Sequence, residues 1–66
     1  MYRVIVHVSD EEVATFEFLE DSLQDARRLA EEIAQRGFWL EDRDPRIFIP
    51  ASRVSLVQVL PDRSAR

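Results

Sequence analysis

One segment of the chain has the periodicity of an amphipathic helix, and it limits the fold more than any other feature. Ser22 is a favourable N-cap with Asp25 three residues later, and Gly37, the only glycine, falls where a left-handed residue ends a helix. One helix can cover only one face of a sheet, so any further apolar sheet face must be buried in another way. The apolar positions of the predicted helix share one arc: Leu23, Ala26, Leu29, Ala30, Ile33 and Ala34.

The sequence before the helix predicts two strands joined by a polar break. Residues 2–8 and 13–20 are rich in β-branched and aromatic side chains that alternate along the chain, and residues 9–12 are polar or acidic. Two such runs across a short break are typical of an antiparallel hairpin. Alternation then places Val4 and Val6 on one face and Ile5 and His7 on the other.

The sequence after the helix predicts two short strands and a longer one. Residues 38–40 and 46–49 flank a turn at 42–45, and residues 54–60 form the last strand, after a corner at 51–53. The order is ββαββ(β), so we predict a single small α+β domain with a mainly antiparallel sheet and one amphipathic helix packed on one face. The domain spans residues 1–61, and residues 62–66 are expected to be a frayed tail.

Several of these strands are apolar on both faces, which indicates self-association. A half-solvated strand should alternate with polar residues, and an uncovered apolar patch commonly marks an interface. Each large aliphatic side chain removed from water contributes about 1.5–3 kcal/mol, so we expect a homodimer. Pairing through a sheet face and through a strand edge both remain open, and the alternative is a sheet that closes into a small barrel. The candidate interface residues are Ile5, Trp39, Arg46, Phe48, Val57 and Val59.

On the sheet face that the helix does not cover, we expect Ile5, Phe48 or its neighbours, and one of two alternating pairs in the last strand. Periodicity leaves open whether that pair is Val57 with Val59 or Leu56 with Leu60. In the short strand after the helix, one of Phe38 and Trp39 must point inward and the other outward. An outward Trp39 beside Arg46 is a candidate contact residue, because Trp and Arg are enriched at interface hot spots.

Residue types exclude several kinds of chemistry. The chain has no Cys, which removes disulfides, thiolate zinc sites and thiol redox chemistry, and one glycine cannot form a phosphate-binding loop. His7 is the only imidazole, and no nucleophile elbow accompanies any serine, so we expect no catalytic residue. The acidic pairs lack the spacing of a calcium loop. We therefore expect no metal site and no cofactor.

Charge argues against nucleic acid and membranes as partners. The net charge is −4, and all nine basic residues are arginine. Phe38, Trp39, Phe48, Arg43 and Arg46 are the nearest approach to a nucleic-acid platform, but acidic residues share their hairpin and would repel phosphate. The N-terminal residues lack the long apolar run of a signal peptide, and no segment is apolar enough to span a bilayer. We expect a cytoplasmic protein.

Residues 21–37, DSLQDARRLAEEIAQRG, resemble the Ser-x-x-Glu-Ala helix start found in small domains such as the HicB-type antitoxins. Asp25 and Ala26 stand at the Glu-Ala place, and the Pro/Gly-rich approach of that family is replaced by VATFEFLEDS. The segment FIPASRVSLVQV looks like the end of many small prokaryotic and phage reading frames, a likeness that assigns no activity.

These features lead to two expectations about function. The first is a non-enzymatic protein that acts through protein contacts and self-association. The alternative is an antitoxin-like or inhibitor-like regulatory partner whose surface of arginine and acidic residues docks on a larger basic protein. A small enzyme comes third, and it would need a concave pocket around His7.

Overall fold

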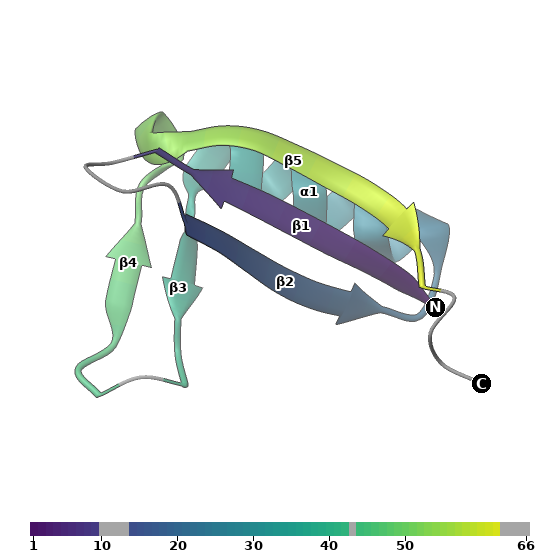
Figure 1. The fold of residues 1–66 in the computed structure, drawn as a ribbon, viewed down its shortest axis with the longest axis horizontal. Helices are drawn as coiled ribbons and strands as arrows, with labels where there is room; N and C mark the ends of the chain where they lie inside the picture. Colours follow the sequence, from purple (N-terminus) through teal and green to yellow (C-terminus); the bar gives the residue numbers. More distant parts are fainter. Residues whose placement is uncertain (10–13, 43, 63–66) are drawn as a thin grey trace.

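The protein folds as predicted into an α+β domain with one helix and five strands (Figure 1). The structure is a computed structural model that describes residues 1–9, 14–42 and 44–62. The elements are β1 (Tyr2–Val8), β2 (Ala14–Glu20), α1 (Leu23–Arg36), β3 (Phe38–Leu40), β4 (Ile47–Ile49), the 3₁₀ helix η1 (Ala51–Arg53) and β5 (Val54–Pro61). Four expectations involve residues outside the described ones: the acidic break at 10–12, Val13 at the start of the second strand, Arg43 in the predicted turn, and the tail at 63–66.

The domain has two layers: an open three-stranded main sheet and the helix on one side of it. The strand order of the sheet is β2-β1-β5, and both pairings are antiparallel. Helix α1 lies behind this sheet in Figure 1, on one face alone. Strands β2 and β5 are the two edges, so the barrel that the sequence left open as an alternative does not form. Within the described residues, no helix is long and apolar enough to cross a membrane.

The remaining strands, β3 and β4, form a separate two-stranded ribbon. The expectation that Phe48 or its neighbours lie on the second face of the main sheet is wrong. Trp39 pairs with Phe48 in the ribbon, which projects from one end of the main sheet in Figure 1. The ribbon packs against the rest of the domain through Phe38 and Leu40, which are buried. Trp39, between them, points outward.

The core lies between the main sheet and the helix. Val4, Val6 and Val8 of β1 are buried against Ala26 and Ile33 of α1, together with the two inward side chains of β3. Phe16 and Phe18 of β2 extend this core by edge-on contacts with the Phe38 ring, at centroid distances of 5.6 and 5.7 Å. The helix stripe is narrower than predicted, because Leu23 and Ala34 lie at its margin and are exposed.

A bulge in β5 decides which of its residues face the core. Val8 pairs with Val54 and His7 pairs with Leu56, so Ser55 has no partner on β1. The Ser55 hydroxyl donates a hydrogen bond to the His7 carbonyl at 3.0 Å. The extra residue shifts the alternation, and Val54 and Val57 both pack against the core although they are three positions apart.

Both ends of the helix are fixed by the residues that the sequence indicated. The Asp25 backbone N–H donates to the Ser22 hydroxyl at 3.1 Å, and the Gly37 N–H donates to the Ile33 carbonyl at 2.9 Å. Gly37 has the expected positive φ of 84°, but its ψ of −166° differs from that of a left-handed cap. The difference arises because the chain passes directly from the helix into β3.

Candidate functional site

The six candidate interface residues occupy three different environments. Ile5 lies on the sheet face that points away from the helix, which we call the open face. Trp39 and Phe48 lie on the β3–β4 ribbon, and Arg46 immediately precedes β4. Val57 and Val59 are partly buried and pack against the core on the helix side of the sheet. The six residues therefore do not form one surface.

The open face carries a cluster of exposed aliphatic side chains that the register brings together. Ile5 is at its centre, and Leu19 of the edge strand β2 and Leu56 and Leu60 of the opposite edge strand β5 lie at positions diagonal to it in the register. Leu19 is 53% exposed, Leu56 51% and Leu60 39%. The sequence offered Leu56 with Leu60 as one of two possible outward pairs, and the β5 bulge selects it.

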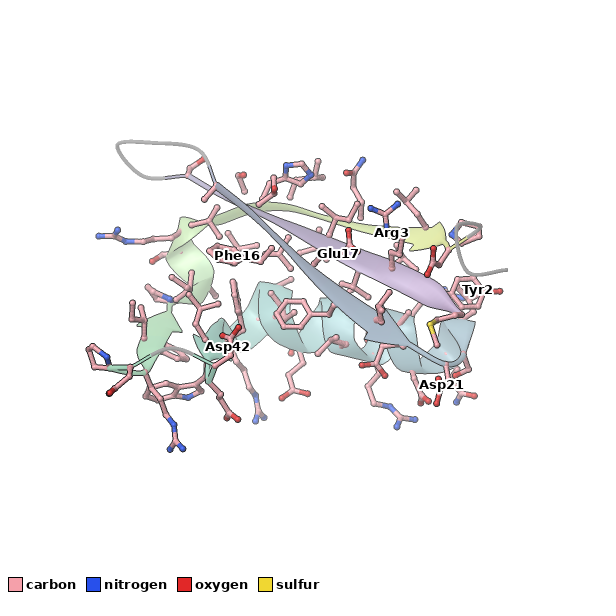
Figure 2. All side chains as sticks on the ribbon, turned by 60° about the horizontal axis from the view of Figure 1, so that its bottom comes forward. Tyr2, Arg3, Phe16, Glu17, Asp21 and Asp42 are labelled. Atoms are coloured by element: carbon pink, nitrogen blue, oxygen red, sulfur yellow. The ribbon has the colours of Figure 1, made fainter. Side chains whose placement is uncertain are left out.

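The polar side chains between these aliphatic groups are paired with each other. Arg3 of β1 and Glu17 of β2 form an ion pair at 2.5 Å, and Figure 2 shows both on the side of the sheet away from the helix. The hydrogen bond that Arg3 donates to Glu17, and then the negative charge of Glu17, raise the pKa of the Arg3 guanidinium. Next to Ile5 on the same face, the His7 ring Nε2 donates to the Gln58 side-chain oxygen at 2.9 Å.

His7 is not joined to a nucleophile. Its ring contacts the Gln58 amide, and the nearby Ser55 hydroxyl donates to the His7 backbone carbonyl instead of the imidazole. No polar or charged residue is buried among the described part of the chain. Within residues 1–9, 14–42 and 44–62, no group of three or more His, Asp or Glu side chains is arranged to hold a metal ion.

The β3–β4 ribbon presents an aromatic pair to solvent. Trp39 and Phe48 are cross-strand partners with ring centroids 5.1 Å apart and planes tilted by 55°. Their exposed fractions are 54% and 43%. Phe48 supports one side of the indole, and the pair extends the apolar surface beyond the main sheet.

A groove runs between the edge strand β2 and the ribbon. It has a volume of about 480 Å³, and we call it the Trp39 groove. A smaller hollow of about 240 Å³ adjoins it and shares Phe18, Trp39 and Glu41 as lining residues. Figure 2 shows Phe16 under the sheet and Asp42 on the ribbon side. The Trp39 groove is lined chiefly by Phe16, Phe18, Trp39, Leu40, Glu41 and Asp42.

Sequence reasoning missed two parts of these surfaces. Leu19 was not a candidate although alternation places it on the same strand face as Glu17, away from the core side chains Phe16 and Phe18, so the period of this strand could have found it. The Trp39 groove could not be found in this way, because it depends on where the ribbon packs beside β2. Comparison of the chain with known protein families, curated proteins and solved structures finds no significant match.

Proposed function

We propose that this chain is a non-enzymatic protein that acts through protein contacts and self-associates as a homodimer through the open face. The observation that supports the proposal is a sheet with a helix on one face and four aliphatic side chains on the other, three of them exposed. Leu19, Leu56 and Leu60 lie diagonal to Ile5 on the two edge strands, and each contributes about 1.5–3 kcal/mol when it is fully removed from water. This gain is large relative to the stability of a domain of this size.

The charge distribution favours a second copy of the chain as the occupant of this face. The chain carries a net charge of −4, so two copies repel each other over most of their surfaces. The open face is different, because Arg3 and Glu17 neutralise each other within one copy. His7 and Gln58 likewise satisfy each other. Two such faces can meet without bringing like net charges together and without leaving these polar groups unpaired.

The test measures mass against concentration for the intact chain and for charged variants of the open face. Sedimentation equilibrium of the unmodified chain is expected to show a dimer that dissociates on dilution. Leu19→Glu and Leu56→Glu lie on opposite edge strands, so both should shift the equilibrium towards monomer if the faces pack together. Pairing through the β5 edge would leave Leu19→Glu without effect.

Leu23→Glu is the matched control. Leu23 is also an exposed leucine, at 43%, but it lies on the helix and away from the open face. It adds the same charge to an already acidic chain, so general repulsion would affect all three variants equally. A chain that remains monomeric at every concentration, or three variants with the same loss of dimer, would contradict the proposal.

A further inference from the structure

We infer that the Trp39 groove binds an extended, arginine- or lysine-bearing segment of a partner protein, laid along the edge strand β2. The inference rests on the proposed function in that it takes the chain to act through protein contacts. It does not depend on the dimer, because the aliphatic side chains of the open face do not line the Trp39 groove, although Glu17 borders the groove and pairs with Arg3 on the open face. Three features of the groove support it: its aromatic lining, its charge and the strand at its border.

The aromatic lining suits both the methylene groups and the charged group of an arginine or lysine side chain. Trp39 lines both hollows and is backed by Phe48, which holds the indole in place while more than half of its surface stays exposed. A guanidinium or ammonium group is attracted to the face of an indole within about 6 Å of the ring. The methylene stem of the same side chain covers apolar surface, here offered by Phe18 and Leu40.

The charge of the groove selects a cation. Glu41 and Asp42 lie at its ribbon side, and Glu32 lines the adjoining hollow. Among the described residues, no arginine lines either hollow, and none of these three carboxylates has an ion-pair partner within 4.0 Å. A nucleic-acid backbone or a second copy of this acidic chain would add net negative charge here. A basic segment would instead be attracted.

The strand at the border favours an extended conformation of the bound segment. Within the described residues β1 is the only strand that pairs with β2, so β2 is an edge of the sheet. Edge strands accept a further strand through main-chain hydrogen bonds, and pockets beside the edge then select alternate side chains. Two adjoining hollows that share Trp39 suit side chains at positions i and i+2 of such a segment, about 7 Å apart.

The test uses a short capped peptide in which arginine alternates with threonine, titrated into the intact chain. Trp39 is the only tryptophan, so intrinsic fluorescence reports directly on the groove, and calorimetry gives the affinity independently. We expect saturable binding, and at least about a tenfold loss when glutamine replaces each arginine of the peptide. Absence of saturable binding, or equal affinity for both peptides, would overturn the inference.

Matched variants separate a specific groove from general attraction to an acidic protein. Glu41→Gln should weaken peptide binding by about fivefold, whereas Glu31→Gln, the same change on the outer helix surface, should alter it less than about twofold. Equal effects of the two variants would count against the groove. The dimer-breaking Leu56→Glu variant should still bind the peptide, so a failure of this inference can be distinguished from a failure of the proposed dimer.

Discussion

At the scale of single residues, Gly37 is a position where the backbone tolerates little change. Its φ of 84° and ψ of −166° lie in a region open almost only to glycine. An added Cβ would lie 2.1 Å from the Ile49 carbonyl oxygen and 2.9 Å from the Ala51 nitrogen. We expect Gly37→Ala to cost about 3 kcal/mol or more, from backbone strain and this collision.

Urea unfolding followed by circular dichroism measures the cost. Gln35→Ala, at an exposed position two residues earlier in the helix, is the control and should change the free energy of unfolding by less than about 0.5 kcal/mol. A Gly37→Ala variant within about 1 kcal/mol of the unmodified chain would show that the helix end is not constrained as described. The sequence predicted this glycine at the helix end because a left-handed residue, commonly glycine, ends many helices. Its ψ could not be predicted, because it depends on how the chain enters β3.

At the scale of elements, the helix is held by its apolar stripe from Ala26 to Ile33 and only weakly by its first turn. Ile33 is 1% exposed in the core, whereas Leu23 at the first turn is 43% exposed. Ile33→Ala should therefore lose about 2–5 kcal/mol through the cavity that it leaves. Leu23→Ala should lose less than about 1 kcal/mol. The two urea midpoints, measured side by side, check the difference, and similar losses would mean that the first turn packs more closely than the structure shows.

The strands illustrate how far a sequence can predict elements and their pairing. The alternation in residues 2–8 and 13–20 predicted the first hairpin and its faces, because both strands are long enough for a clear period. The strands at 38–40 and 46–49 and their hairpin were also predicted, with the second strand beginning one residue too early, but the sequence did not show that this hairpin leaves the main sheet. Their separation into a ribbon is set by the burial of Phe38 and Leu40 and by the turn at Gly37, which are tertiary effects.

At the scale of the whole molecule, the two proposed surfaces should respond to salt in opposite directions. Raising the ionic strength from about 0.01 M to about 0.1 M shortens the screening length from about 30 Å to about 10 Å. Screening reduces repulsion between two chains of charge −4, so the dimer should tighten. The same change weakens the attraction between the acidic groove and the arginine peptide, so peptide binding should fall.

Sedimentation and tryptophan fluorescence at the two salt concentrations provide this comparison. The Leu56→Glu variant serves as the control for the peptide measurement, because it removes any contribution of dimerisation to the fluorescence signal. If added salt strengthened both dimerisation and peptide binding, or weakened both, then charge would not govern one of the two surfaces in the way proposed. The net charge was available from the sequence, but its separation into a neutral face and an acidic groove required the fold.

The bulge at Ser55 has a consequence for how the gene can change. Ser55 has no partner across the ladder, so the loss of its codon would leave a regular strand in which Val54, Leu56, Val57, Gln58, Val59 and Leu60 alternate between the two faces. The loss of a codon such as that of Gln58 would instead turn later side chains to the opposite face. Length variation within this strand should therefore be tolerated at position 55, and an alignment of related chains should open its gap there.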